Sequence, residues 1–230
     1  MYFRYDDEAI RYLKERDPLL GEAIDRIGPV KRAVDPDLFA SLVNSMIGQQ
    51  ISSKAHVTIW NRLVGMLGEV TPENVLAHTD EELQAIGVSF RKVSYIKGAA
   101  EKIASGEVDI EALHALSDEE LCRELSELKG IGQWTAEMLM LFSMERPDIL
   151  SYGDLAIVRG LRMLYRHRKI TPELYRKYKR RYSPYASVAS LYLWEIAGGA
   201  LPELTDPAPM TEAEKKKRAK ARRAAPRKKS

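Results

Sequence analysis

The sequence predicts an all-α protein, an irregular two-lobed helical bundle, and three observations support this fold class. Apolar residues recur at helical spacing, as in Leu121, Leu125 and Leu128. Helix N-terminal signals are frequent, and Thr79 and Ser117 each stand three residues before a glutamate, which is the capping-box pattern. No segment alternates apolar and polar residues for long enough to predict a β-strand.

Local start and stop signals divide the chain into successive helices. Proline follows a good N-cap at Thr71, Thr171 and Ser183, where its missing N–H removes no helical hydrogen bond. Gly87 and Gly106 stand where helices should end. In chain order, the predicted helices cover residues 7–16, 19–27, 37–48, 52–67, 72–78, 80–86, 89–105, 109–115, 118–128, 133–145, 155–166, 172–181 and 184–197.

Charge is distributed unevenly along the chain. The formal net charge of the 230 residues is +3. Ten Lys or Arg and two Glu give residues 211–230 a net charge of +8, which leaves −5 for residues 1–210. We therefore expect a folded domain over residues 1–205. Residues 206–230 form a basic tail, which is too poor in apolar side chains to order itself and is predicted to be disordered.

Composition excludes several classes of protein. A single cysteine, Cys122, rules out a disulfide scaffold, a four-cysteine iron–sulfur cluster and a four-thiolate zinc site. The four histidines show no metal-ligand spacing. No apolar run approaches the roughly 18–20 residues that span a bilayer, and the N-terminus lacks the features of a signal peptide. We expect a soluble intracellular protein that is not secreted and has no membrane partner.

The most informative segment is LKGIGQWTA, residues 128–136. Gly130 and Gly132 permit a tight turn between two helices and a close approach of the backbone to a ligand. The first N–H groups of the second helix lack internal partners, and together with Lys129 they favour an anion such as a DNA phosphate. A plain corner between two helices is the alternative interpretation.

Three blocks carry a resemblance to a known family: FASLVNSMIGQQIS at 39–52, the segment 128–136, and GDLAIVRG at 153–160. Their order and spacing resemble those of the helix-hairpin-helix DNA glycosylases of base-excision repair, and most closely the 3-methyladenine DNA glycosylase II branch. The resemblance implies two helical lobes around a cleft and a monomer that acts on double-stranded DNA containing a damaged base. Its location would be the cytoplasm or nucleoid, or the nucleus in a eukaryote.

The resemblance assigns catalysis to Asp154. Cleavage of an N-glycosidic bond builds positive charge on the deoxyribose, and a fixed carboxylate can stabilise that charge and orient the attacking water. At a helix N-terminus the helix dipole favours an ionised carboxylate. Asp154 could alternatively serve only as an N-cap. The family commonly has a proline shortly before this aspartate, whereas this chain has Leu150-Ser151-Tyr152-Gly153.

Trp134 indicates the subclass. Bifunctional members of the superfamily place a lysine at this hairpin position, where it forms a Schiff base and leads to strand cleavage. An indole cannot act as that nucleophile, and Lys129 lies on the phosphate side of the hairpin. The resemblance therefore implies a monofunctional glycosylase that hydrolyses the bond to an alkylated base, such as 3-methyladenine, and leaves an abasic site.

Aromatic side chains are the candidates for holding a cationic alkylated base through cation–π contacts. The base-pocket candidates are Trp134, Tyr152 and Trp194. Met138 stands where the resembled enzyme has a tyrosine, and Phe39 could form a wall. Helical core spacing around Trp194 and an apolar helix start at Phe39 are the alternative interpretations.

Contacts with DNA are expected at the hairpin and at a loop that fills the gap left by the extruded base. The loop candidates are Gln49, Gln50, Ile51 and Ser52, although polar residues that simply end a helix are an alternative. The hairpin candidates are Lys129, Gly130, Ile131, Gly132, Gln133 and Thr135. No cofactor is implied for the chemistry. The resemblance also implies a possible Na⁺ or K⁺ site formed by the backbone carbonyls of Ser126, Leu128 and Ile131.

Two other functions stay open from the sequence. A non-catalytic DNA-binding or damage-recognition protein could keep the fold and the hairpin, but it would have no reason to keep Asp154 facing a polyanion. A glycosylase for oxidised or mismatched bases is the other alternative, because the pocket residues do not define the lesion.

Overall fold

The computed structural model describes residues 1–208, so the predicted tail lies outside the described residues except for residues 206–208. Within this range the chain is helical, with no β-strand and one isolated bridge between Tyr2 and Ala33. The all-α prediction is confirmed. The helices are α1 (Asp7–Arg16), α2 (Pro18–Ile27), α3 (Leu38–Gly48), α4 (Ser53–Leu67), α5 (Pro72–Leu76), α6 (Asp80–Ala85), α7 (Phe90–Ala104), α8 (Ile110–Leu113), α9 (Asp118–Glu127), α10 (Gln133–Phe142), α11 (Leu155–Tyr165), α12 (Pro172–Tyr182) and α13 (Ala186–Gly198).

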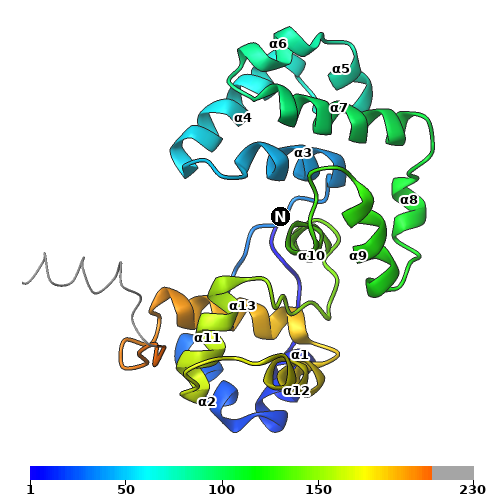
Figure 1. Ribbon diagram of the computed structural model, residues 1–230. Coiled ribbons are helices and arrows are strands. Elements are labelled where there is room, and N and C mark those ends of the chain that lie inside the picture. Colours follow the sequence, from blue (N-terminus) through cyan, green and yellow to red (C-terminus); the bar gives the residue numbers. More distant parts are fainter. Residues whose placement is uncertain (209–230) are drawn as a thin grey trace, which may run out of the picture.

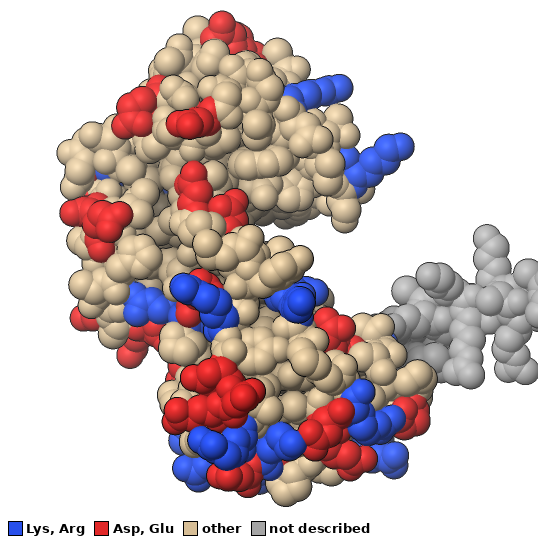
Figure 2. Space-filling model, turned by 180° about the vertical axis from the view of Figure 1, so that it is seen from behind, with Lys and Arg blue, Asp and Glu red and all other residues tan. Residues whose placement is uncertain are grey.

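The helices form two lobes, as predicted (Figure 1). One lobe combines both ends of the described chain, because α1 and α2 pack against α11, α12 and α13. The other lobe is continuous in sequence and contains α3 to α10. A deep notch separates the two lobes in the space-filling view, and acidic and basic side chains are mixed over the lower lobe there (Figure 2).

Local signals explain where the helices begin and end. Thr79 and Ser117 both form complete capping boxes with the glutamates three residues later. The clearest difference from the prediction concerns α10, which ends at Phe142 rather than at residue 145. Glu145 adopts φ +49°, and the Arg146 N–H turns back to the Met140 carbonyl at 2.9 Å. This left-handed turn closes the helix earlier than its apolar periodicity suggested.

Helices α11 and α13 approach each other closely at Gly160. A Cβ atom built on Gly160 would overlap the backbone carbonyl of Leu193. A side chain of any other residue type would therefore push the two helices apart. Their close contact brings Trp194, on α13, to the N-terminal end of α11.

A buried carboxylate connects the N-terminal helices to the C-terminal ones. Asp17 is almost fully buried and caps α2. Its Oδ2 accepts hydrogen bonds from the Tyr165 hydroxyl at 2.6 Å and from Arg181 Nη1 at 2.5 Å. These partners compensate the carboxylate for the water that it loses on burial.

The described chain stays attached to this lobe beyond the predicted domain boundary at residue 205. Asp206 accepts a hydrogen bond from Arg162 Nε at 2.8 Å, and this contact holds the pKa of Asp206 below its usual value. Among residues 1–208, no helix has both the length and the apolar character that crossing a membrane would require.

Candidate active site at the helix-hairpin-helix

The hairpin between α9 and α10 depends on one of its two glycines for its shape. Gly130 adopts φ +90°, and a Cβ there would lie 2.5 Å from the Tyr95 ring. Gly132 differs, because a Cβ on it would meet no atom within 4 Å. The fold therefore requires glycine at 130, whereas at 132 the missing side chain leaves open space beside the turn.

This open space lies at the N-terminus of α10. Gly132 is the N-cap, and no side chain caps the helix there. The first N–H groups of α10 therefore remain available to an anion. The neighbouring side chains of Lys129 and Gln133 are exposed, whereas those of Ile131 and Thr135 are buried. Of the predicted hairpin contacts, Ile131 and Thr135 thus offer an approaching ligand their backbone rather than their side chains.

The predicted gap-filling loop lies against this hairpin. Gln49 Nε2 donates a hydrogen bond to the Gly130 carbonyl at 2.7 Å, so its amide is already engaged. Gln50 is exposed and adopts φ +57°, and Ile51 and Ser52 are exposed as well. The loop thus presents Gln50 and Ile51 to the solvent while Gln49 fixes it to the hairpin.

Lys92 also supports this loop, and no sequence pattern predicts that role. Its Nζ donates hydrogen bonds to the carbonyls of Ile47 and Gln49, both at 2.7 Å. These carbonyls lie at the end of α3, where helical partners are missing. Partial burial, with a smaller effect of Arg91, lowers the pKa of Lys92.

Asp154 is the N-cap of α11 and is 8% exposed. Its Oδ1 accepts hydrogen bonds from the backbone N–H groups of Ala156 and Ile157 at 2.9 and 2.8 Å. Asp154 therefore does cap the helix, and the cap fixes the carboxylate at the start of α11.

Two indoles also donate to this carboxylate. Trp134 Nε1, from the first turn of α10, lies 3.0 Å from Oδ2 of Asp154. Trp194 Nε1, from α13, lies 3.1 Å from Oδ1. All four contacts of the carboxylate are thus with N–H donors, which are the partners that an ionised carboxylate can accept. Three helices, α10, α11 and α13, meet at this side chain.

The two tryptophans differ in what else surrounds them. Trp134 is 47% exposed. Trp194 is partly buried, stacks on Phe142 with ring centroids 5.4 Å apart, and lies 5.5 Å from the Arg32 guanidinium. Trp134 therefore offers the more open aromatic surface beside Asp154.

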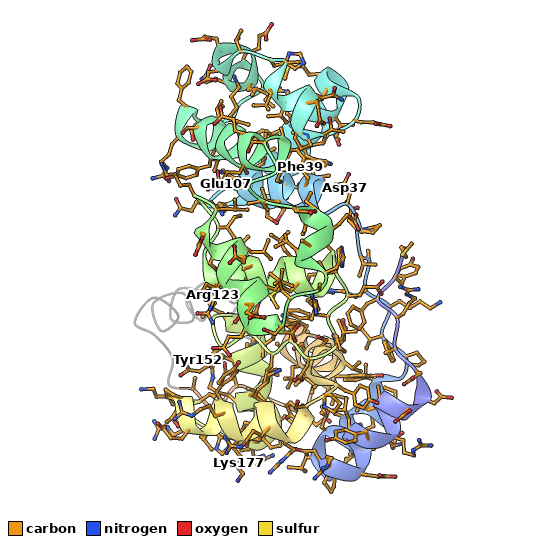
Figure 3. All side chains as sticks on the ribbon, turned by 90° about the vertical axis from the view of Figure 1, so that its right-hand side faces the viewer. Asp37, Phe39, Glu107, Arg123, Tyr152 and Lys177 are labelled. Atoms are coloured by element: carbon orange, nitrogen blue, oxygen red, sulfur yellow. The ribbon has the colours of Figure 1, made fainter. Side chains whose placement is uncertain are left out.

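The other predicted pocket residues divide into two groups. Tyr152 is 39% exposed, its hydroxyl donates to the Ile170 carbonyl, and Met138 is half-buried on α10. Phe39 is only 3% exposed, and it lies on the upper lobe, away from Tyr152 (Figure 3). The structure places Phe39 in the core, so it does not form a wall beside Tyr152. Leu155, which directly follows Asp154, is 85% exposed and was not predicted as a site residue.

The segment of residues 148–154, which ends at Asp154, is held in place by side chains from other elements. The Tyr175 hydroxyl donates to the Leu150 carbonyl at 2.5 Å, and Ser190 Oγ donates to the Ile149 carbonyl at 2.8 Å. Burial, followed by the charges of Glu137 and Asp148, raises the pKa of Tyr175 to about 12. These contacts fix the position of the segment that ends at Asp154.

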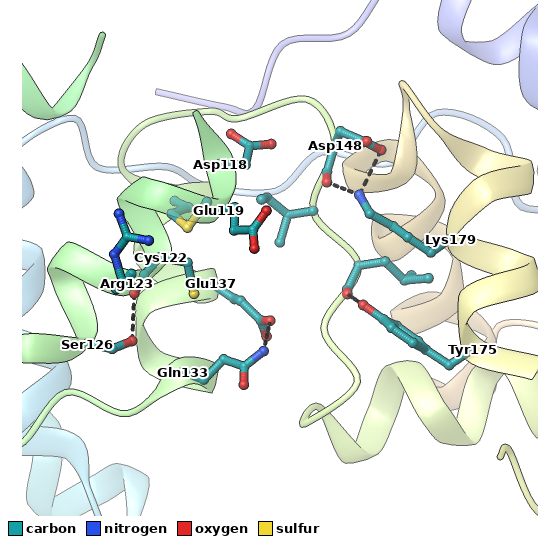
Figure 4. A pocket seen from close by; sticks show the side chains of 13 residues that line it. Asp118, Glu119, Cys122, Arg123, Ser126, Gln133, Glu137, Asp148, Tyr175 and Lys179 are labelled. Atoms are coloured by element: carbon teal, nitrogen blue, oxygen red, sulfur yellow. Dashed lines mark hydrogen bonds and ion pairs between the residues drawn. The ribbon is translucent and has the colours of Figure 1, made fainter. Parts of the chain in front are cut away.

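A cavity of about 620 Å³ opens next to this segment, between α9, α10, residues 148–150 and α12 (Figure 4). Gln133 and Glu137 face it from α10, opposite the ion pair of Lys179 with Asp148 at 3.0 Å. Asp154 does not line this cavity. In the described part of the chain, no group of three or more His, Cys, Asp or Glu side chains could hold a metal ion.

Comparisons with known proteins agree with this geometry. Residues 43–184 match the family described as HhH-GPD superfamily base excision DNA repair protein. The chain is similar to DNA-3-methyladenine glycosylase 1 of Schizosaccharomyces pombe, with 36% identity over 164 residues, which cover 69% of this chain and 72% of that protein.

Two solved structures are similar as well. One is a DNA-3-methyladenine glycosidase from Bacillus halodurans, with 36% identity, a TM-score of 0.80, and coverage of 88% of this chain and 95% of that one. The other is the S. pombe 3-methyladenine DNA glycosylase in complex with abasic DNA, with 33% identity, a TM-score of 0.70, and coverage of 82% and 95%. On the family match and these similarities, the chain belongs to the HhH-GPD superfamily of base excision DNA repair proteins.

Proposed function

We propose that this chain is a monofunctional DNA glycosylase that flips an alkylated base, such as 3-methyladenine, out of double-stranded DNA. It hydrolyses the N-glycosidic bond and leaves an abasic site. The observation that carries this proposal is the buried Asp154 carboxylate, held by four N–H donors next to the exposed Trp134. The names of the similar proteins, which are 3-methyladenine glycosylases, support it.

Asp154 supplies the electrostatic part of this chemistry. As the base leaves, positive charge develops on the deoxyribose, and a carboxylate near C1′ stabilises it. The four donors hold Asp154 in place before the substrate arrives, so little reorganisation is needed during the reaction. The same carboxylate orients the attacking water.

Trp134 determines the product. The side chain that reaches Asp154 from the first turn of α10 is an indole, which has no nucleophilic amine. A Schiff base with the sugar cannot form at this position, so the strand is not cleaved. The reaction therefore stops at the abasic site.

The exposed aromatic surface beside Asp154 holds the base. Alkylation at a ring nitrogen makes the base cationic, and an aromatic face attracts a cation by about 0.5–2 kcal/mol. Trp134 and Tyr152 offer such faces, and Met138 adds an adaptable apolar contact. Trp194 contributes less surface, because Phe142 and Arg32 already contact its ring.

Binding of the duplex uses the hairpin and the loop beside it. The uncapped N-terminus of α10 and the exposed Lys129 bind a backbone phosphate. Gln50 and Ile51 enter the gap in the base stack, since both are exposed while Gln49 is bound to Gly130. We infer further that the protein acts as a monomer inside the cell, at the nucleoid or in the nucleus, where its substrate is.

No cofactor is needed for this hydrolysis, but the hairpin suits a monovalent cation. The predicted ligands are the carbonyl oxygens of Ser126, Leu128 and Ile131. Within residues 1–208, no hydrogen-bond donor reaches the carbonyls of Ser126 or Ile131, while that of Leu128 accepts from the Ile131 N–H. The carbonyl oxygens of Ser126 and Ile131 are thus free to bind a hard cation such as Na⁺ or K⁺, which would strengthen binding to a phosphate.

A lesion panel tests the proposed function. Purified full-length protein is incubated with duplexes that carry an alkylated, a deaminated or an oxidised base, and the products are analysed with and without alkali. We expect release of the alkylated base, strand breaks only after alkali, and no covalent complex trapped by borohydride. A trapped adduct would identify a bifunctional enzyme, and binding without release of any base would identify a DNA-binding module.

A further inference from the structure

Glu137 lies on α10, one turn after Trp134, and makes two contacts that the proposed chemistry has not used. Its Oε1 accepts a hydrogen bond from Gln133 Nε2 at 3.0 Å. Its Oε2 accepts a hydrogen bond from the hydroxyl of Ser151. Figure 4 shows Gln133 and Glu137 bonded to each other at the edge of the cavity between the lobes.

Ser151 is the residue through which Glu137 reaches the segment that carries Asp154. Its side chain is fully buried, and its carbonyl accepts a weak hydrogen bond from the Asp154 N–H at 3.4 Å. A buried hydroxyl without a partner is costly, by about 1–3 kcal/mol, so the position of Ser151 depends on Glu137.

The hydrogen bond between Glu137 and Ser151 differs from those that Tyr175 and Ser190 make with residues 148–154, because its partner comes from the other lobe. Tyr175 and Ser190, which hold Leu150 and Ile149, come from α12 and α13 in the same lobe as α11. Glu137 comes from α10, the helix of the other lobe that also carries Trp134 and the DNA-facing hairpin. Together with the Trp134–Asp154 hydrogen bond, this contact therefore sets the spacing between the hairpin helix and the start of α11.

We propose that Glu137 is a positioning residue, which fixes Asp154 relative to the hairpin helix through its hydrogen bond with Ser151. The inference rests on the proposed role of Asp154 and adds a requirement to it. A carboxylate that acts by electrostatics must be held within about 0.5 Å of its productive position. In this chain the Glu137–Ser151 bond provides part of that constraint.

Two substitutions at one position separate the contact from the charge. Glu137→Ala removes the acceptor and leaves the Ser151 hydroxyl unpaired. Glu137→Gln keeps an acceptor for Ser151, and its amide N–H₂ can donate to the side-chain oxygen of Gln133 after that amide flips. Glu124→Ala is the matched control, since Glu124 is an exposed glutamate on the neighbouring helix α9.

The first measurement is the single-turnover excision rate on an alkylated duplex, together with the affinity for that duplex. We expect Glu137→Ala to lower the rate by about 10- to 100-fold while the affinity changes by less than about threefold, because a small misplacement of a reacting group has an effect of this size. Glu137→Gln should stay within about threefold of the unsubstituted protein in both quantities, and Glu124→Ala should match it.

The second measurement needs no activity and reads the position of Asp154 directly. The indole N–H signals of Trp134 and Trp194 in ¹⁵N–¹H NMR spectra report their hydrogen bonds to Asp154, and the third tryptophan, Trp60 on α4, is an internal control. Glu137→Ala should shift the Trp134 and Trp194 signals and leave that of Trp60 in place. Glu137→Gln should leave all three unchanged.

These readouts distinguish the two proposals. If the unsubstituted protein excises no base from any duplex, the proposed function fails, and the NMR signals still decide whether Glu137 positions Asp154. Unshifted Trp134 and Trp194 signals in Glu137→Ala would overturn the positioning role. A Glu137→Gln variant as impaired as Glu137→Ala would overturn it too, because the charge rather than the contact would then matter.

Discussion

Two short segments, residues 128–132 and 148–154, connect helices on either side of the candidate site, and they are stabilised in different ways. The hairpin is shaped by its backbone: Gly130 adopts φ +90°, and the Ile131 N–H bonds to the Leu128 carbonyl at 2.9 Å. The segment before Asp154 is shaped by side chains, which reach it from α10, α12 and α13.

The difference suggests how each segment can change without loss of the site. The hairpin excludes a Cβ at Gly130, and its helix end is left without a side-chain cap. The segment before Asp154 imposes few demands on its own backbone, but it depends on partners elsewhere in the chain. In the proposed function, the hairpin contacts DNA phosphates through backbone N–H groups, and the other segment places a single carboxylate.

The largest effect should come from Asp154, at the end of the segment 148–154. Asp154→Asn keeps one oxygen for the N–H groups of Ala156 and Ile157 but replaces the other acceptor by an N–H₂ group that faces an indole N–H. We expect the excision rate to fall by about 10²–10³-fold or more, because a preorganised charge is lost. Single-turnover kinetics measures this loss, and DNA affinity serves as the control. Excision near the original rate would remove Asp154 from the mechanism.

The next largest effect should come from deletion of the basic residues 209–230, which shows how much of the DNA affinity the rest of the chain provides. Residues 209–230 lie outside the described part of the chain and carry a net charge of +8, whereas the rest of the chain carries −5. Each phosphate neutralised contributes about −0.9 to the slope of log affinity against log salt. If three or four basic residues contact phosphates, deletion of 209–230 should flatten this slope by about three units.

The deletion spares Asp206 and its bond to Arg162, so the folded lobe keeps that contact. Affinities measured at several salt concentrations for both proteins give the slopes. Equal slopes would mean that the hairpin and its surroundings account for all phosphate contacts.

A third test uses the two hairpin glycines as a matched pair. Gly130→Ala forces alanine into φ +90° against the Tyr95 ring, so the free energy of unfolding should fall by about 1–3 kcal/mol. Gly132→Ala meets open space, so stability should change by less than about 0.5 kcal/mol. Its Cβ would obstruct a phosphate, and affinity should drop equally for damaged and undamaged duplexes. If Gly132→Ala binds undamaged DNA with unchanged affinity, the hairpin only connects two helices and does not contact a phosphate.

The smallest effect concerns Tyr175, which bonds to the segment before Asp154. Burial raises the pKa of Tyr175 to about 12, so the folded protein keeps this hydroxyl neutral at a pH where the unfolded chain ionises it. Its contribution to stability is therefore complete below about pH 10 and is lost as the pH rises from about 10 to 12. Tyr175→Phe should lower stability by about 1 kcal/mol at neutral pH through loss of the bond to Leu150.

Denaturant unfolding across this pH range tests the expectation. The Tyr175→Phe protein should lose less stability between pH 10 and 12 than the unsubstituted protein does. Tyr2→Phe, at an exposed side chain, is the matched control. Parallel profiles for the Tyr175→Phe and unsubstituted proteins would show that this hydroxyl does not contribute as inferred.

The fold could be predicted from the sequence because its signals are local. Each predicted helix occurs within residues 1–208 with its ends within three residues of the predicted ones, and both predicted capping boxes form. Asp154 could be singled out by the resemblance and by its place before a helix. The hairpin could be predicted because Gly130 and Gly132 are separated in the chain by Ile131 alone.

The contacts of the site could not be predicted, because they join residues far apart in the sequence. Ser151 meets Glu137 across 14 residues, Tyr175 meets Leu150 across 25, and Lys92 reaches Ile47 across 45. The sequence predicts aromatic surfaces at Trp134 and Trp194, but nothing in its pattern indicates that both indoles donate to one carboxylate. No periodicity distinguished Phe39, a core residue, from a pocket wall.

The network around Asp17 has a consequence for how the protein is made. Asp17 emerges from the ribosome early, whereas its partners Tyr165 and Arg181 are synthesised some 150 residues later. The lobe of α3 to α10 is continuous and can fold during synthesis, since domains generally fold in order from the N-terminus. The lobe that presents Asp154 closes only when the chain has passed Arg181. A nascent chain interrupted earlier carries the hairpin but lacks the closed lobe, so it could touch DNA without the means to excise a base.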